Sequence, residues 1–197
     1  MAKVSAIVLA AGLSRRMGPE NKLGLLYQGK PLVHHVIDQL SKSVASEIII
    51  VTSEVSQELF PDHEIILNEY YQTGMTSSIQ AGVRAASKQT DGYMICLGDQ
   101  PLIQTEDYNQ IIQAFGEQLM SDAKTIILPS YQGKKGNPVV FSLEHKQAIL
   151  DHPQPEGCKE IVQTNKEHVV LTALNTPGIL LDVDQREDYE ILRKGIN

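Results

Sequence analysis

Short apolar runs rich in β-branched residues recur along the chain, and each is bounded by turn-forming residues. Most of these runs are nearly continuous rather than alternating, which is typical of strands covered on both faces. Segments with helical periodicity lie between them, over 31–43, 77–86, 107–119 and 188–192. The alternation predicts a doubly wound α/β sandwich. The expected strands begin at Val4, Glu47, Glu64, Gly92, Thr125, Asn137 and His168.

The composition narrows the class of protein further. A chain of 197 residues with 42% hydrophobic positions is sized for one globular domain, so we expect a single domain over residues 1–197. The formal net charge of −7 provides no general attraction to nucleic acid or to anionic lipid. No apolar run approaches the roughly 20 residues that a bilayer requires. Two cysteines are too few for a disulfide scaffold, which indicates a reducing setting. We therefore expect a cytoplasmic protein with no nucleic-acid or membrane partner.

A glycine-containing loop, LAAGLSRRMGPENKL over residues 9–23, directly follows the first expected strand. Its small residues, Gly12 among them, let backbone N–H groups approach a polyphosphate, and Arg15, Arg16 and Lys22 supply positive charge. The loop has neither the GxGxxG nor the P-loop pattern. Ligands of open α/β sheets bind beyond the carboxyl ends of the strands, so the loop predicts an anion site. The alternative is a glycine-rich turn with surface arginines.

Carboxylates also follow the expected strands. Asp99 closes the strand that begins at Gly92, where a hard oxygen ligand can hold Mg²⁺ against phosphate oxygens. The alternative is an aspartate that only forms the turn. Near the end of the chain, Asp182 and Asp184 alternate in an extended segment. We expect them to point to opposite faces, so that only one of them faces the site.

Two further loops carry polar groups. A polar loop precedes the helix whose first turn holds Thr76, Ser77 and Ser78, and these hydroxyls can cap the helix or hydrogen-bond a nucleobase. In the segment GKKGNPV, the glycines permit close approach of a ligand and the two lysines add charge. A plain hairpin turn is the alternative for this second loop.

These motifs resemble those of the MobA-like nucleotidyltransferases, and within that family they are most similar to the molybdenum cofactor cytidylyltransferases. The resemblance covers nearly the whole chain. It implies a Rossmann-like three-layer α/β/α sandwich of the nucleotide-diphospho-sugar transferase type with a mostly parallel sheet, an NTP donor, a Mg²⁺ ion and release of pyrophosphate. The motifs that carry it are LAAGLSRRMG with NKL, GMTSSIQAG, GDQPL, GKKGNPVVF and LDVDQREDY.

The resemblance also implies a role for individual positions. Asp184 matches the metal-ligand position of the family pattern D-I-D-T-P-E-D, although Gln185, Arg186 and Glu187 replace the usual Thr-Pro-Glu. The expected catalytic residues are Arg16, Lys22 and Asp99, and the expected metal ligands are Asp99 and Asp184. The expected nucleotide-binding residues are Leu9, Ala10, Ala11, Gly12, Ser14, Arg16, Lys22, Gly74, Ser78 and Gly82. The expected acceptor-binding residues are Gly136, Asn137 and Lys159, the last standing where the family usually has arginine.

The function that these expectations imply is transfer of CMP from CTP to the phosphate of molybdenum-carrying molybdopterin. The preference for CTP over GTP rests on Ala11, because the guanylyltransferase relatives more often carry glycine there. One alternative is guanylyl or cytidylyl transfer to another phosphate acceptor. Another is a non-catalytic nucleotide- or cofactor-binding maturation partner of molybdenum hydroxylases. A molybdenum hydroxylase or its chaperone is the expected protein partner.

Overall fold

The central feature of the computed structural model, which describes residues 1–14, 17 and 20–194, is a mixed β-sheet. In this part of the chain eight strands form the sheet in the order β10-β7-β9-β6-β1-β4-β5, with β8 beside β7. Their bounds are β1 (Val4–Ala10), β4 (Glu47–Thr52), β5 (Ile65–Leu67), β6 (Gly92–Leu97), β7 (Ile126–Tyr131), β8 (Lys134–Lys135), β9 (Val139–Ser142) and β10 (Val169–Ala173). The short strands β2 (Leu26–Tyr27) and β3 (Lys30–Pro31) pair separately as an antiparallel ribbon.

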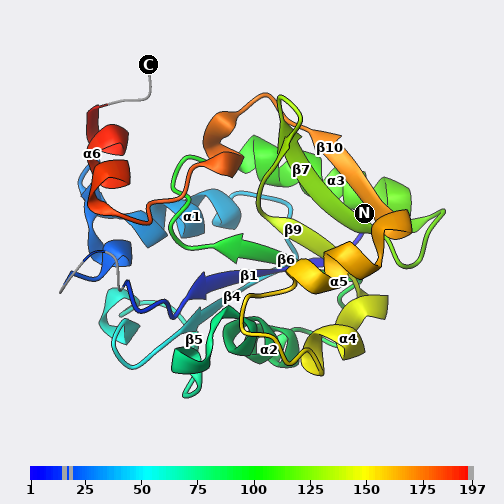
Figure 1. Ribbon diagram of the computed structural model, residues 1–197, viewed down its shortest axis with the longest axis horizontal. Coiled ribbons are helices and arrows are strands. Elements are labelled where there is room, and N and C mark those ends of the chain that lie inside the picture. The colour runs from blue at the N-terminus through cyan, green and yellow to red at the C-terminus, as the bar shows by residue number, and fades with distance from the viewer. Residues whose placement is uncertain (15–16, 18–19, 195–197) are drawn as a thin grey trace.

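Helices cover both faces of the sheet (Figure 1). Within β1, Val4, Ala6 and Val8 belong to the core that α1 and α3 cover, whereas Ile7 belongs to the core that α2, α4 and α5 cover. This alternation is what a strand buried on both faces requires. The helices are α1 (Leu32–Ser41), α2 (Met75–Ala85), α3 (Thr105–Leu119), α4 (Lys146–Leu150), α5 (Lys159–Thr164) and α6 (Arg186–Lys194). Single 3₁₀ turns are η2 (Lys22–Gly24), η3 (Gln57–Leu59), η4 (Tyr71–Thr73), η5 (Leu143–His145), η6 (Lys166–His168) and η7 (Pro177–Leu180).

The direction of the strands places several loops at one edge. Strands β6, β1, β4 and β5 are mutually parallel, so their carboxyl ends lie together. The chain adds β4 and β5 on one side of β1 and then returns to place β6 on the other side. Such a reversal of strand order opens a crevice for ligands at the carboxyl ends of the strands. The loops after β1 and β6 are the ones that border it.

The observed elements confirm the predicted Rossmann-like three-layer sandwich. All seven expected strands form, and β9 alone among them runs antiparallel to its neighbours β6 and β7. The helix expected to begin at Ser77 begins two residues earlier, at Met75. Sequence periodicity did not predict α4 and α5, because helices of five and six residues are too short to show a repeating apolar stripe. Among the described residues, no helix has both the length and the apolar character to cross a membrane.

Candidate active site

A pocket of about 370 Å³ lies at the carboxyl ends of β1 and β6. Part of its lining was expected from the sequence: Leu9, Ala11, Gly12, Lys22, Gly74, Ser78, Asp99 and Asp184. The rest of its lining was not assigned to the site: Leu13, Leu23, Tyr71, Gln72, Met75, Leu97, Gly98 and Asp182. Residues from the two ends of the chain therefore meet at one edge of the sheet.

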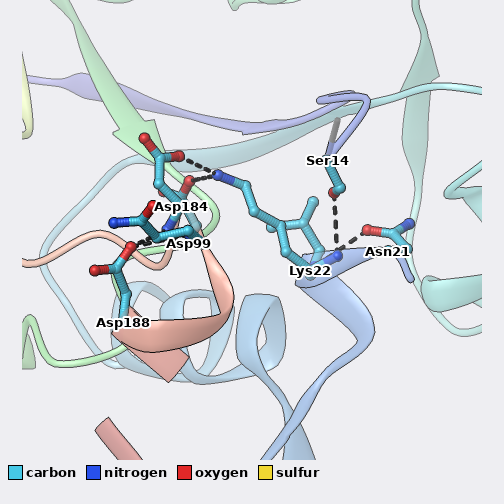
Figure 2. A network of polar contacts seen from close by, with 8 residues as sticks. Ser14, Asn21, Lys22, Asp99, Asp184 and Asp188 are labelled. Atoms are coloured by element: carbon cyan, nitrogen blue, oxygen red, sulfur yellow. Dashed lines mark hydrogen bonds and ion pairs between the residues drawn. The ribbon is translucent and has the colours of Figure 1, made fainter. Parts of the chain in front are cut away.

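Local hydrogen bonds fix the backbone of Lys22 at the floor of this pocket. The Ser14 hydroxyl accepts from the Lys22 backbone N–H at 3.1 Å. Ser14 itself has a φ of 48°, which turns the loop back on itself. The side chain of Asn21 accepts from the N–H of Leu23 at 3.1 Å and so caps η2. Its amide group also donates to the Ser56 hydroxyl at 2.8 Å. The lysine side chain is thereby directed from the β1 loop toward the strand end at Asp99 (Figure 2).

The ammonium of Lys22 forms ion pairs with Asp99 and Asp184. Its Nζ lies 2.7 Å from Oδ1 of Asp184. Burial by itself lowers the pKa of Lys22, but the two carboxylates outweigh it and raise that pKa above its ordinary value. Burial raises the pKa of Asp99 despite the opposing effect of Lys22, and Asp182 and Asp184 raise it further. The pKa of Lys22 thus rises because of the two carboxylates, whereas that of Asp99 rises mainly because of its burial.

The C-terminal segment is held in place by three hydrogen bonds that its backbone N–H groups donate. The N–H of Val183 donates to the carbonyl of Asp99 at 3.1 Å, which ties the segment to the end of β6. The N–H groups of Asp184 and Gln185 donate to one carboxylate oxygen of Asp188, at 3.0 and 2.9 Å (Figure 2). Asp188 thus fixes the backbone of Asp184 where α6 begins.

The expectation that Asp182 and Asp184 point to opposite faces was wrong. Carboxylate oxygens of Asp99, Asp182 and Asp184 all lie within 4.8 Å of one another, and both C-terminal aspartates line the pocket. Side chains two residues apart in an extended segment share a face, and it is the residue between them that turns away. Here that residue is Val183, which is 3% exposed and packs with Leu32 and Tyr189.

The donor set suits a hard divalent cation. Carboxylate oxygens are the ligands that Mg²⁺ and Mn²⁺ prefer. Among the described residues, Oδ1 of Asp99 is buried and has no hydrogen-bond partner. A buried carboxylate oxygen without a partner is costly, and a cation would satisfy it. The geometry therefore fits a metal held by Asp99 and Asp184, with Asp182 as a third carboxylate.

Ser78 of α2 lines another side of the pocket, and Asn68, which directly follows β5, holds it from outside the pocket lining. Asn68 is 4% exposed and donates from Nδ2 to the hydroxyls of Ser77 and Ser78, both at 2.9 Å. The Ser77 hydroxyl shares its single proton between the carbonyls of Tyr70 and Gly74, at 3.0 and 2.9 Å. Since Ser78 accepts from Asn68, its own hydroxyl proton is available for an acceptor in the pocket. Neither hydroxyl caps α2, contrary to the capping alternative.

The structure separates three expected nucleotide-binding positions by role. Gly74 borders the pocket with a φ of 123°, and a Cβ there would lie 2.5 Å from Cβ of Pro155. Gly82 lies instead within α2 on the face toward β1, where a Cβ would be 2.3 Å from Cγ2 of Ile7, so it lets the helix approach the strand. Ala10 is fully buried in the core with α1 and α3. Gly82 and Ala10 therefore shape the fold and do not line the pocket.

A second pocket, of about 440 Å³, adjoins the first and shares Met75 and Leu97 with it. The three expected acceptor-binding residues, Gly136, Asn137 and Lys159, all line it. Lys135 adds a second cation and lies in β8, which pairs with β7. The loop therefore forms the hairpin that was its alternative, and acceptor binding by its residues stays a prediction. The remaining walls are largely apolar and include Ile79, Ile95, Leu128, Val139, Phe141 and Val162.

Arg16, expected to be catalytic and to bind the nucleotide, lies outside the described residues, as does Arg15. Of the pocket residues that sequence reasoning missed, Tyr71 and Gln72 had a visible signal, because they stand in the polar loop directly before α2. Asn68, which contacts the pocket residue Ser78 from outside the lining, had no such signal, because a single asparagine after a short strand is common in turns.

Fold and site together place the chain among the nucleotidyltransferases. More particularly, it belongs to the MobA-like NTP transferase family, whose domain profile matches residues 6–169. The family to which the sequence motifs pointed is thereby confirmed.

Individual relatives are similar over most of their length. The molybdenum cofactor cytidylyltransferase of Escherichia coli (strain K12) is 27% identical over 195 residues, which cover 96% of this chain and 95% of that protein. A molybdenum cofactor guanylyltransferase of Vibrio campbellii is 28% identical, over 84% of this chain and 81% of the relative. The structure of Rv0371c from Mycobacterium tuberculosis H37Rv in complex with manganese has the same fold, with a TM-score of 0.81 and 20% identity over 99% of this chain and 100% of that one.

Proposed function

We propose that this nucleotidyltransferase is a CTP:molybdenum cofactor cytidylyltransferase, which transfers CMP from CTP to the phosphate of molybdenum-carrying molybdopterin and releases pyrophosphate. One observation carries the proposal: a charged pocket with Lys22 and three carboxylates shares the wall residues Met75 and Leu97 with a second, largely apolar pocket. Two substrates bound in adjoining pockets can react directly, without a covalent enzyme intermediate.

In the proposed reaction, an oxygen of the acceptor phosphate attacks the α-phosphorus of CTP, and the bond from that phosphorus to pyrophosphate breaks. The acceptor is already an anion, so no general base is required. Catalysis consists of aligning the reactants and compensating the charge that develops on the leaving group. Gly12 offers space in the loop after β1, because among the described residues beyond its chain neighbours no atom lies within 4 Å of a Cβ built there. Lys22 supplies positive charge to the phosphates in this pocket, and Arg16 is proposed to supply a second positive charge.

A divalent ion fits the carboxylates of Asp99 and Asp184, and we propose Mg²⁺ in the cell. When bound, such an ion supplies positive charge to phosphate oxygens. The manganese complex of the similar Mycobacterium tuberculosis protein supports a divalent metal at this fold. The buried Oδ1 atom of Asp99 that lacks a partner supports a ligand from this chain's own geometry.

The second pocket has the chemistry that a pterin with a phosphate tail requires. Its apolar walls suit a flat ring, and the amide of Asn137 can hydrogen-bond the polar edge of that ring. Lys135 and Lys159 provide charge for an anionic group. Lys159 supplies a point charge rather than the planar fork of an arginine, so we expect it to steer the phosphate without fixing its orientation.

The proposal of CTP rather than GTP depends on Ala11, which is 4% exposed at the rim of the first pocket. The named relatives act on the same cofactor with different nucleotides at nearly equal identity to this chain, so overall similarity does not choose between them. A methyl group at position 11 leaves less room for a purine than a glycine would. The small pyrimidine ring is therefore the proposed base.

Incubation of the protein with Mg²⁺, molybdenum-loaded molybdopterin and one NTP at a time tests the proposal. We expect pyrophosphate release and a product heavier by one CMP with CTP, and much slower release with GTP or ATP. Preference for GTP would refute the nucleotide assignment. Turnover with another phosphate compound but not with molybdopterin would refute the acceptor. Binding of both substrates without pyrophosphate release would favour a non-catalytic maturation partner of molybdenum hydroxylases.

The variant Asp99→Asn sharpens this test. The amide keeps the shape of the side chain but removes a negative charge from the metal site, so transfer should fall by at least a hundredfold, on the order of 3 kcal/mol. Asp38→Asn is the matched control, because Asp38 forms an exposed ion pair with Lys30 and lines neither pocket. Equal activity of Asp99→Asn and the control, with normal Mg²⁺ dependence, would reduce Asp99 to a turn former.

A further inference from the structure

The loop between α4 and α5, residues 151–158, is fastened to the first turn of α2 by one buried hydroxyl group. Oγ1 of Thr76 donates to the carbonyl of Gln154 and accepts from the N–H of Gly157 at 3.0 Å. The N–H of Thr76 donates to the carbonyl of Pro155 at 3.4 Å. Thr76 is 5% exposed, so water does not readily replace these partners. A hydroxyl both donates and accepts, and no apolar side chain of the same shape can do so.

Packing around this contact leaves little room for movement. The glycine before α2, Gly74, faces Pro155 so closely that a Cβ would lie 2.6 Å from the proline carbonyl oxygen. A Cβ at Gly157 would lie 3.0 Å from Sδ of Met75. One turn further along α2, Nε2 of Gln80 shares its two N–H protons among three carbonyls at and just after the end of α4, those of Ile149, Leu150 and His152, at 3.0–3.1 Å.

The contact joins the linings of the two pockets, which share Met75 of α2. On the α2 side, Gly74, Met75 and Ser78 line the nucleotide pocket. On the loop side, residues 156–159 line the acceptor pocket. Thr76 itself lines neither of them. The Thr76 hydroxyl therefore fixes the position of residues 156–159 of the acceptor pocket relative to Gly74, Met75 and Ser78 of the nucleotide pocket.

We propose that Thr76 is a positioning residue for the acceptor: it holds residues 156–159, which include Lys159, at the distance from the nucleotide pocket that transfer requires. This inference rests on the proposed two-substrate function. Loss of the hydroxyl leaves the N–H of Gly157 and the carbonyl of Gln154 without partners, and the loop then opens more often. Acceptor binding should suffer, whereas nucleotide binding should not.

The test compares Thr76→Val with Thr76→Ser, using kcat and KM for the acceptor, the Kd for CTP, and amide hydrogen exchange over residues 154–159. Valine keeps the shape and removes the hydroxyl, and we expect an acceptor KM higher by roughly tenfold with a CTP Kd within about twofold of normal. Exchange at Gly157 should be faster by a similar factor. Serine should restore all three values. Thr73→Val is the matched control, since its hydroxyl is exposed and donates only to the nearby carbonyl of Tyr70.

Several outcomes would overturn the proposal. One is an unchanged acceptor KM in Thr76→Val. Another is a CTP Kd that worsens as much as the acceptor KM, which indicates general damage to the fold. If Thr76→Val does not fold, Gln80→Met removes the contacts that hold the end of α4 and the start of the same loop against α2, and it should raise the acceptor KM in the same direction. No change in that variant refutes the proposal. If the wild type transfers CMP to no acceptor, the proposed function fails, and unchanged exchange at residues 154–159 would then refute the positioning role separately.

Discussion

Replacing Lys22 with methionine should destabilise the protein and should make its stability depend on a divalent cation. Methionine retains most of the aliphatic stem of the lysine but carries no charge. The ammonium compensates Asp99 and Asp184, and the side chains of Lys22 and Asp99 are only 13% and 12% exposed. In Lys22→Met three carboxylates face one another within 4.8 Å and have no cation from Lys22.

The size of the effect follows from burial. Removing one partner of a buried ion pair costs about 3–5 kcal/mol. The low end applies here, because the Asp184 side chain is 42% exposed and water screens it. A loss of about 3 kcal/mol corresponds to a melting temperature lower by roughly 6–12 °C for a protein of this size. Mn²⁺ or Mg²⁺ should restore much of the loss, because the ion supplies the missing positive charge to the same oxygens.

Thermal and urea unfolding with EDTA, and again with millimolar Mn²⁺, measure both effects. Lys30→Met is the control, because that lysine pairs with Asp38 at the surface, where the side chains are 58% and 39% exposed. We expect the control to lose no more than about 1 kcal/mol and to gain nothing extra from Mn²⁺. Two results would refute the reasoning: a Lys22→Met protein as stable as the control without metal, or equal stabilisation of both variants by Mn²⁺.

Two further predictions concern glycine and alanine positions. Gly82→Ala should lower the free energy of unfolding by about 1–3 kcal/mol, because the added Cβ would overlap Cγ2 of Ile7. The CTP Kd of the folded variant should stay unchanged. A weaker CTP Kd together with normal stability in a urea titration would instead make Gly82 a nucleotide contact. Ala11→Gly should shift nucleotide preference toward GTP by about 1–3 kcal/mol, measured as the ratio of kcat/KM for CTP and GTP, and a wild type that already prefers GTP would contradict the role of the Ala11 methyl group.

The central strands and long helices could be predicted from the sequence because burial leaves a direct trace there. Strand β1 lies between two helical layers, so nearly every residue from Val4 to Ala10 is buried and the run has no polar alternation. Helix α1 shows the complementary pattern, with Leu32, Val33, Val36, Ile37 and Leu40 buried on one stripe. The direction of β9 had no such trace. An antiparallel strand in a covered sheet carries the same apolar residues as a parallel one.

Within the site, sequence reasoning worked where one loop carries several signals at once. The loop after β1 combines small residues with cations, and Ala11, Gly12 and Lys22 from it line the nucleotide pocket. It failed at Gly82, where the same residue type serves packing rather than ligand access. It singled out Thr76 as a capping or base-binding residue but gave no hint of the positioning role proposed for it, because that role depends on contacts with residues 154–157, about 80 positions away in the chain. Spacing within a motif cannot reveal a partner outside that motif.

The misplaced Asp182 illustrates how the fold gives a local pattern its meaning. The sequence Asp182-Val183-Asp184 has polar, apolar and polar positions, and in any extended segment the two outer side chains share a face. Which face they share is decided by Val183, since its burial beside Leu32 and Tyr189 is favourable only if the two carboxylates turn outward. The N–H of Val183 then reaches the carbonyl of Asp99, and the same contact brings the third carboxylate to the site. The burial of Val183, which contacts no ligand, therefore brings the three carboxylates together. Val183→Ala should leave the positions of all three carboxylates less fixed relative to one another.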